Sequence, residues 1–344
     1  MNKYYFLIDN MLWGWAERVV SNLAKEYLKL WKDVYLFTLT KGLFYNIPQD
    51  VHYIHLSNLK NCRLATLLVP LFSLKFKYYL KKFWLNEGIS FLETSNFVHI
   101  LSKKNAWISF RIHIDYYNKG PYWKFWKILI KWLYPKAGKI IVNSRENKYD
   151  LARFLWIRNN KIDVWYNSFD KENMKLLSNE GIEDNLIDII KNKKVFITTW
   201  RLARQKHHDK IINALFEYNK KEKNWIYLII WDWEKRWELE NLVKSLLLNN
   251  QIVFLWQKKN VFKYLKHADL YLYASEIEWF PNALLEAREM WLKIISSDFK
   301  SWAREVIFWE NTDTIWKNLQ YPVEWKYWVL IDWDNYTQQI QKYI

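Results

Sequence analysis

Segments with the pattern of a strand alternate with segments that have the pattern of a helix, and this alternation limits the fold more than any other feature of the chain. The first series starts with a strand over residues 3–9 and an amphipathic helix over 15–30. Its further strands are predicted over 34–39, 51–55, 89–93, 106–110 and 139–142. Ser144 is a good N-cap for the helix that follows. Such alternation is typical of a parallel sheet with helices on both faces, so we predict an α/β protein.

A second series of the same kind occupies the other half of the chain. Its strands are predicted over 194–199, 226–230, 252–255, 270–273 and 293–296, with helices over 206–218 and 234–247. A polar stretch with few strand formers separates the two series. We therefore predict two doubly wound, Rossmann-like domains that face each other across a cleft. The predicted parts are an N-terminal domain over 1–170, a linker over 171–192, a C-terminal domain over 193–332 and the start of a helix over 333–344.

Tryptophan and glycine occur in inverted proportions. The chain holds 24 tryptophans and 6 glycines, whereas an ordinary chain of this length holds roughly 24 glycines. Tryptophan also stands where tight turns usually need glycine, as in Trp13-Gly14-Trp15 and Trp231-Asp232-Trp233. We interpret many of these tryptophans as glycine codons (UGA) translated with the wrong genetic code, because composition and position agree. The alternative is a truly Trp-rich protein.

Charge and cysteine content narrow the setting. A formal net charge of +16 suits a nucleic acid, a phosphate-rich ligand or an anionic membrane surface. The Lys-rich codon bias of an AT-rich genome would also produce it. The single cysteine, Cys62, excludes an internal disulfide and fits a reducing compartment such as the cytoplasm. The apolar segment 64–74 has basic ends; we predict a core helix, and the alternative is a helix at a membrane interface.

Candidate ligand-binding residues follow three of the predicted strands, where open parallel sheets bind their ligands. The turn of Trp13, Gly14 and Trp15, if built of glycine, would present free N–H groups at a helix start to an anion. Arg201 and Lys206 lie five residues apart, and together they could neutralise a diphosphate. The alternatives are a plain tight turn and a solvated pair of cations.

The third place holds two carboxylates that are eight residues apart. Glu278 is predicted in a loop and Glu286 in the helix that follows it. Carboxylates bind sugar and ribose hydroxyls well, because each offers two acceptor oxygens. The alternative for any single Glu here is surface charge or a first-turn residue favoured by the helix dipole.

The ordered set of motifs resembles the family-4 glycosyltransferases, which are retaining enzymes of the GT-B fold. With selected tryptophans taken as glycine, the resemblance runs from Asp9 to about Asp332. It is carried by a GGxER-like turn, a GRL…QK-like segment, the E-x7-E motif and an SGxxE-like segment, at residues 13–20, 200–206, 278–286 and 297–305.

The resemblance implies a hexosyltransferase whose donor is a nucleotide sugar, a UDP- or GDP-sugar, with no metal and no further cofactor. Arg201, Lys206 and the Trp13–Trp15 turn would bind the donor diphosphate. Glu278 would contact the donor sugar and act in catalysis. The donor sugar and ribose would also be bound by a short run of residues that closes the motif: Phe280, Pro281, Asn282 and Glu286.

Three departures from the family pattern are visible. The family often has a histidine after the fourth or fifth strand, and here Arg111 occupies the aligned place with His113 two residues on; either is a candidate catalytic residue. His207 stands where the family commonly has glycine. The family usually has a longer C-terminal tail, so the chain is expected to be truncated.

The predicted function is transfer of a sugar to a glycan or lipid-linked acceptor in cell-surface polysaccharide or lipopolysaccharide synthesis. We expect a cytoplasmic protein, with peripheral contact to an anionic membrane and no nucleic-acid partner. The alternative is a Trp-rich basic protein that binds carbohydrate or nucleic acid without catalysis, using exposed indoles for stacking. A third alternative is an inactive relative that has only the fold.

Overall fold

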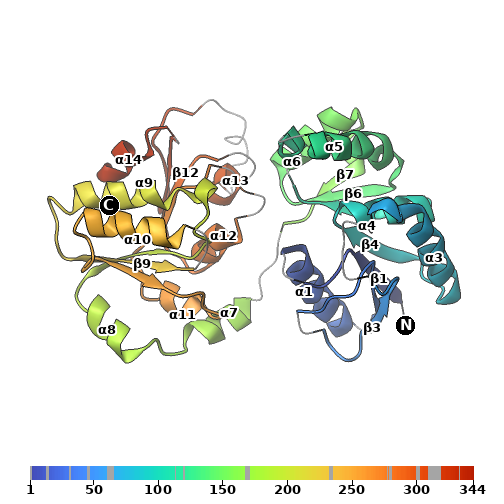
Figure 1. Cartoon of the computed structure of the whole chain (residues 1–344), viewed down its shortest axis with the longest axis horizontal. Coiled ribbons are helices and arrows are strands. Elements are labelled where there is room, and N and C mark those ends of the chain that lie inside the picture. Colours follow the sequence, from blue (N-terminus) through green and yellow to red (C-terminus); the bar gives the residue numbers. More distant parts are fainter. Residues whose placement is uncertain are drawn as a thin grey trace. The chain divides into compact units, whose positions relative to one another are not determined.

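The computed structural model divides into two compact units, Met1–Asn167 and Ser168–Ile344 (Figure 1). The residues that the structure describes are 2–12, 15–30, 32–44, 47–59, 66–112, 114–118, 121–166, 171–231, 235–276, 278, 281–299, 303–308, 319–332 and 334–344. Each unit is built on one largely parallel sheet. The predicted α/β class with two Rossmann-like units is therefore confirmed.

The sheet of the first unit has seven strands in the order β3-β2-β1-β4-β5-β6-β7, and the described pairs are parallel. The strands are β1 (Lys3–Ile8), β2 (Asp33–Thr38), β3 (His52–His55), β4 (Glu87–Phe91), β5 (Trp107–Phe110), β6 (Lys139–Val142) and β7 (Ile162–Val164). Because the strands are parallel, their carboxyl ends lie along one edge, where β1, β4 and β5 are consecutive neighbours.

Helices cover both faces of this sheet. They are α1 (Trp15–Lys29), α3 (Val69–Lys82), α4 (Glu93–Ser102), α5 (Pro121–Leu133) and α6 (Arg145–Leu155). Alternate residues of β1 enter different cores, as a strand's period of two requires. Tyr5 and Leu7 pack with α3, α4, α5 and α6, whereas Tyr4 and Phe6 pack on the side of α1. The predicted N-cap is confirmed, since the Ser144 side chain accepts a hydrogen bond of 2.9 Å from the Asn147 N–H.

The sheet of the second unit has the order β10-β9-β8-β11-β12-β14-β13. Its strands are β8 (Lys194–Thr198), β9 (Trp225–Ile230), β10 (Ile252–Leu255), β11 (Leu270–Tyr273), β12 (Lys293–Ser297), β13 (Val323–Trp325) and β14 (Trp328–Ile331). The pair β13–β14 is antiparallel and the other described pairs are parallel. Every residue of β9 is buried, as expected for a strand covered on both faces.

The helices of the second unit are α7 (Lys171–Ser178), α8 (Asp184–Ile190), α9 (His208–Tyr218), α10 (Arg236–Ser245), α11 (Phe262–Leu265), α12 (Asn282–Glu289), α13 (Ala303–Ile307) and α14 (Tyr336–Gln339). The stretch 171–192, predicted as a linker, thus contains α7 and α8. It is bound to the rest of its unit by Glu183, which accepts hydrogen bonds of 2.8 Å from Lys258 and Tyr264. At the end of the chain, the predicted helix is one turn, α14, followed by a 3-10 turn over Ile340–Lys342.

Three tryptophans adopt a left-handed backbone conformation directly after a helix. Trp84 follows α3, Trp156 follows α6 and Trp291 follows α12, with φ values of 55°, 58° and 60°. Glycine is the residue that most often takes this conformation at a helix end, because it has no Cβ. The three indoles are also 81%, 85% and 80% exposed. By contrast, Trp225 is fully buried and its indole N–H donates to the Glu222 carbonyl at 3.1 Å.

Candidate active site

A buried ion pair lies beyond the carboxyl ends of β8 and β11, which are neighbours in the second sheet. Lys206 ends a 3-10 turn over Arg204–Lys206, and its ammonium group contacts the carboxylate of Glu278. Each side chain is only 7% exposed. A buried charge is costly unless it is paired, so each of these two residues needs the other. The structure thus brings together two of the residues that the sequence predicts for the site.

The hydroxyl of Tyr273, the last residue of β11, donates to the same oxygen of Glu278. Burial, together with the neighbouring Glu278 carboxylate, raises the pKa of Tyr273 well above its ordinary value. The hydroxyl therefore keeps its proton and serves as a permanent donor. Sequence reasoning missed Tyr273, although its position at the end of a predicted strand was an available signal.

Backbone and hydroxyl contacts hold the two loops of this pair in register. The N–H of Glu276 donates to the carbonyl of Gln205 at 3.0 Å, and the Ser275 hydroxyl donates to the same carbonyl at 3.4 Å. The Ser297 hydroxyl, at the end of β12, donates to the Ser275 carbonyl at 2.8 Å. Three consecutive strand ends therefore fix the position of Lys206 relative to Glu278.

The other predicted residues of this unit differ in exposure. Arg201 has an exposed side chain, and its carbonyl accepts a hydrogen bond of 3.2 Å from His208 Nε2. Glu286 and Asn282 lie on α12 and are 6% and 4% exposed. Pro281, directly before α12, is also buried. Phe280 lies outside the described residues.

Trp200 fills the space beside the ion pair. It is 5% exposed, and its rings lie 4.1 Å from the Tyr273 ring and 5.2 Å from the His208 ring, measured between centroids. The indole Nε1 and His208 Nδ1 are buried and have no hydrogen-bond partner among the described residues. A buried polar group without a partner costs roughly 1–3 kcal/mol. The indole therefore occupies this place with an electrostatic penalty.

His207 has a backbone conformation that favours glycine. Its φ is 42°, in the left-handed region. Its ring nitrogens lie 3.6 Å from a Glu276 carboxylate oxygen and 3.8 Å from an Asp209 carboxylate oxygen. The residue that departs from the family pattern thus sits at a place where a glycine would be unstrained.

The predicted residues of the first unit are described only in part. Trp13, Gly14 and His113 lie outside the described residues, and Trp15 is the first residue of α1. Arg111 follows β5, where its Nε donates to the Ser109 hydroxyl at 2.9 Å. Burial lowers the pKa of Arg111 to about 10, which still leaves the guanidinium charged at neutral pH.

Three carboxyl groups that sequence reasoning missed lie at the same edge of the first sheet. Asp9 follows β1, Glu17 lies in the first turn of α1, and Glu93 begins α4 after β4. Asp9 accepts hydrogen bonds from the Ser95 N–H at 3.0 Å and from its hydroxyl at 2.6 Å. Tyr117 donates its hydroxyl to Glu93. The available signal was that two of these acids come one or two residues after adjacent strands.

Burial raises the pKa of all three groups. The pKa of Asp9 rises to about 6, where the charge of Glu93 adds to burial, and that of Glu17 rises to about 7, where the charge of Asp9 adds to burial. The pKa of Glu93 is raised as well. Close carboxyl groups hinder one another's ionisation. Part of this edge therefore holds protons near neutral pH.

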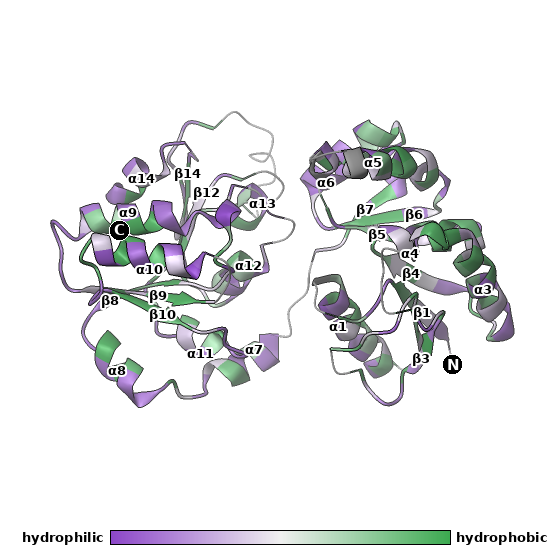
Figure 2. Ribbon diagram, in the orientation of Figure 1, coloured by the Kyte–Doolittle hydropathy of each residue, from purple (hydrophilic) through white to green (hydrophobic). Residues whose placement is uncertain are grey.

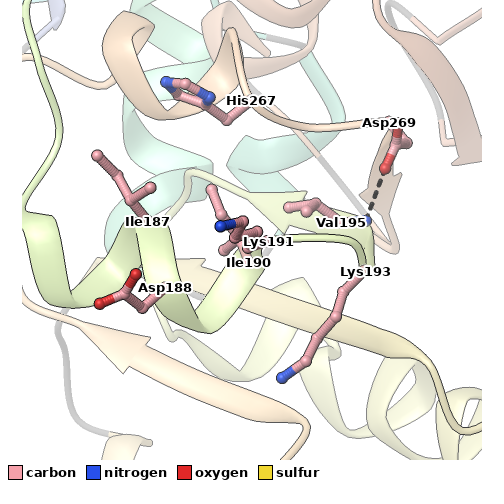
Figure 3. Close-up of a pocket in the computed structure, with 8 residues that line it drawn as sticks. All are labelled: Ile187, Asp188, Ile190, Lys191, Lys193, Val195, His267 and Asp269. Atoms are coloured by element: carbon pink, nitrogen blue, oxygen red, sulfur yellow. Dashed lines mark hydrogen bonds between the residues drawn. The ribbon is translucent and has the colours of Figure 1, made fainter.

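A pocket of about 420 Å³ lies at the opposite edge of the second sheet (Figure 3). It is lined by residues of α8 and by the amino ends of β8 and β11: Ile187, Asp188, Ile190, Lys191, Lys193, Val195, His267 and Asp269. The Val195 N–H donates to Asp269 at 2.7 Å across its wall. Ligands of such sheets bind at the carboxyl ends of the strands, so this pocket is separate from the candidate site.

Two searches of known proteins bear on the whole chain. The family model described as "Glycosyltransferase Family 4" matches residues 14–173, and the model described as "Glycosyl transferases group 1" matches residues 182–317. Between them the two models match both structural units. The chain belongs to the family-4 glycosyltransferases and has the GT-B fold.

Named relatives agree with this family. An uncharacterized glycosyltransferase of Methanocaldococcus jannaschii is 32% identical over 217 residues, which are 63% of this chain and 53%, about half, of that protein. The Campylobacter jejuni N-acetylgalactosamine-N,N'-diacetylbacillosaminyl-diphospho-undecaprenol 4-alpha-N-acetylgalactosaminyltransferase is 28% identical over 89% of this chain and 83% of its own. The crystal structure of Anabaena HepE in complex with UDP and glucose has a TM-score of 0.64 at 17% identity, covering 87% of this chain and 81% of HepE.

Proposed function

We propose that this chain is a retaining, metal-independent hexosyltransferase that moves a sugar from a UDP- or GDP-sugar to a glycan or lipid-linked acceptor. The observation that carries the proposal is the buried pair of Lys206 and Glu278 at the carboxyl edge of the second sheet. Two similar proteins support it. HepE is described in complex with UDP and glucose, and the Campylobacter relative is named for a diphospho-undecaprenol-linked substrate.

In this proposal the second unit binds the donor. Lys206 and the exposed Arg201 neutralise the diphosphate, which is the leaving group. Fixed cations stabilise such developing charge without a metal ion. Glu278 accepts a hydrogen bond from a donor-sugar hydroxyl while Tyr273 and Lys206 hold its carboxylate in place. Phe280, Pro281 and Asn282 line the sugar site, and Glu286 accepts from the ribose hydroxyls.

The first unit would supply the acceptor side. The Trp13–Trp15 turn would approach the diphosphate, and Arg111 or His113 would act near the reacting carbon. The acceptor hydroxyl would attack from the same face as the departing diphosphate, without a covalent enzyme intermediate, so the anomeric configuration would be retained. We propose the cytoplasmic face of the cell membrane as the location, in the assembly of surface polysaccharide or lipopolysaccharide. No helix in the described part of the chain is both long and apolar enough to span a bilayer.

We propose further that many of the tryptophans are glycine in the functional protein. Two structural observations support this. Trp84, Trp156 and Trp291 are exposed indoles on left-handed backbone, and Trp200 is a buried indole with an unpartnered N–H where a phosphate must approach. The gene tests it, because UGA codons are expected at Trp13, Trp15, Trp200, Trp231, Trp233, Trp279, Trp291 and Trp302. Standard tryptophan codons (UGG) at most of these positions would refute the idea.

The alternative of a stacking platform lacks support. A platform needs several indoles in one row, whereas the three exposed indoles at helix ends follow α3, α6 and α12, in two different units.

The enzyme proposal is tested with the chain carrying glycine at the eight positions named above. A panel of UDP- and GDP-sugars is offered, and release of the nucleoside diphosphate is measured with and without a metal chelator. Glu278→Ala should lower turnover by about 10²–10³-fold, the usual effect of losing one well-placed polar group. The matched control is Glu217→Ala on α9, whose carboxylate pairs only at the surface with Lys220. Equal turnover in both variants would contradict the site.

A further inference from the structure

Helix α3 has an apolar side that the fold leaves exposed. Val69, Phe72, Phe76 and Leu80 are buried against the sheet. On the other side, exposed apolar side chains follow one another at spacings of three or four residues, so they form one stripe. They are Leu67, Leu71, Leu74 and Tyr78, with exposures of 78%, 62%, 69% and 59%. The segment predicted as a core helix is therefore a core helix on one side only (Figure 2).

Helix α5 repeats this arrangement. Trp126, Ile130 and Leu133 are buried, whereas Phe125, Ile128 and Trp132 are exposed by 55%, 66% and 65%. These three positions are also three or four residues apart. Both helices bury their inner sides in the same core, on the same face of the sheet, so both stripes point away from that face. The seven exposed residues, Leu67, Leu71, Leu74, Tyr78, Phe125, Ile128 and Trp132, are called the α3–α5 face.

Charge on these two helices has one sign only. The 14 residues of α3 contain Lys75, Lys77, Lys81 and Lys82 and no acid. The 13 residues of α5 contain Lys124, Lys127 and Lys131 and no acid. Most of these lysines are exposed, and Lys136, just beyond α5, lies 3.7 Å from the centre of the Trp132 ring.

Other surface helices of the chain do not combine these features. Helix α10 exposes Trp237 by 72%, but it carries Glu238 and Glu240 next to its lysine and arginine. Helix α9 carries Asp209 and Glu217. Mixed charge suits water, whereas an apolar stripe flanked by lysines alone suits the boundary between lipid headgroups and acyl chains.

We propose that the α3–α5 face docks on an anionic lipid bilayer. The apolar side chains enter the headgroup–acyl boundary, and the flanking lysines contact anionic headgroups. The face deepens the proposed function, because a lipid-linked acceptor resides in a membrane. It is nevertheless measured without donor or acceptor, so its failure and the failure of the enzyme proposal are distinguishable.

The test is flotation of the full chain with vesicles, either of phosphatidylcholine alone or of phosphatidylcholine with about one-third phosphatidylglycerol. We expect flotation with the anionic vesicles only, weakened at 0.5 M salt because lysine–headgroup attraction is screened. The triple variant Leu71→Glu, Leu74→Glu, Ile128→Glu should lower vesicle affinity at least tenfold. The matched control Leu176→Glu, on α7, replaces a leucine that is 71% exposed, and it should bind as the parent does.

A second variant removes charge and leaves the apolar stripe intact. Lys77→Glu, Lys81→Glu, Lys131→Glu should also lower affinity for anionic vesicles at least tenfold, whereas Lys220→Glu, Lys221→Glu in the other unit should not. Circular dichroism checks that each variant is folded. The proposal is overturned if the parent chain ignores anionic vesicles, if it floats equally with neutral ones, or if both triple variants still bind. It is also overturned if light scattering finds a dimer that the apolar variant dissociates, since the occupant is then a second copy.

Discussion

The carboxyl edges of the two sheets share one architecture and carry opposite kinds of charge. In the second unit, buried Lys206 pairs with Glu278, and Arg201 is exposed nearby in sequence. In the first unit, the edge holds Asp9, Glu17 and Glu93, partly protonated near neutral pH. Cations suit a diphosphate, whereas carboxyl groups suit neutral hydroxyls and repel phosphate when ionised. The difference teaches that charge, and not topology, assigns the donor to the second unit and the acceptor to the first.

The largest effect is expected from breaking the ion pair. Lys206→Ala leaves Glu278 buried without its cation, which should lower the free energy of unfolding by about 3–5 kcal/mol. Donor turnover should fall by about 10²–10³-fold in the same variant. Urea unfolding and nucleoside diphosphate release measure the two effects.

A double-mutant cycle separates the pair from its surroundings. Lys206→Ala with Glu278→Ala should cost less stability than the sum of the single variants, because no unpaired charge remains. Lys220→Ala, at an exposed pair, should cost less than about 1 kcal/mol. Strict additivity of the buried variants would show that the contact carries no energy, and the contrast between the two edges would fail.

The carboxyl edge of the first unit predicts a dependence of stability on pH. The pKa of Glu17 is about 7 in the folded chain and about 4.5 in an unfolded one. The folded state therefore binds more protons in this window, and the free energy of unfolding falls as pH rises from about 4.5 to 7. Glu17→Gln should remove on the order of 2 kcal/mol of this loss. Urea midpoints at pH 5 and pH 8 decide it; identical pH slopes in parent and variant would contradict the raised pKa.

A smaller effect is expected at Trp200. Trp200→Gly removes an indole that fills the space beside Tyr273 and lets backbone approach a phosphate. UDP or GDP affinity should rise about tenfold, or about 1.4 kcal/mol, in a competition assay with a fluorescent nucleotide. The control is Trp225→Gly, which removes a fully buried, hydrogen-bonded indole. It should cost about 3–5 kcal/mol of stability and bring no gain in affinity. Weaker binding by Trp200→Gly would indicate that the indole belongs in the site.

The smallest effects are expected at the helix ends. Glycine at Trp84, Trp156 or Trp291 relieves left-handed strain and should raise the free energy of unfolding by about 1 kcal/mol each. Lys82→Gly, inside a helix, is the control and should destabilise by about 1 kcal/mol. Thermal unfolding midpoints measure both. Destabilisation by all three glycines would argue that these tryptophans are native.

Local pattern predicted the elements, and longer-range packing decided the rest. The first strand was predicted over 3–9 and is Lys3–Ile8, because its alternating cores leave a clear apolar run. Residues 171–192 were predicted as a linker because their helices are short and polar, and only packing against α11 shows that they belong to the second unit.

The candidate site was predictable where motifs were distinctive. Lys206 and Glu278 were both named from sequence, but their contact spans 72 positions and depends on β8 and β11 being neighbours. Asp9 and Glu17 were not named, since a single acid after a strand has no distinctive pattern. Their raised pKa comes from burial and from each other, which the sequence does not display.

The central claim is that the second unit carries a cationic diphosphate site that works without a metal ion. Calorimetric titration of UDP and of GDP into the chain with glycine at the eight suspected positions, in the presence of a metal chelator, tests it most directly. The account predicts that one of the two nucleotides binds, and that Lys206→Ala abolishes this binding while Lys220→Ala leaves it unchanged. Binding that survives Lys206→Ala, or a folded chain that binds neither nucleotide, would contradict it.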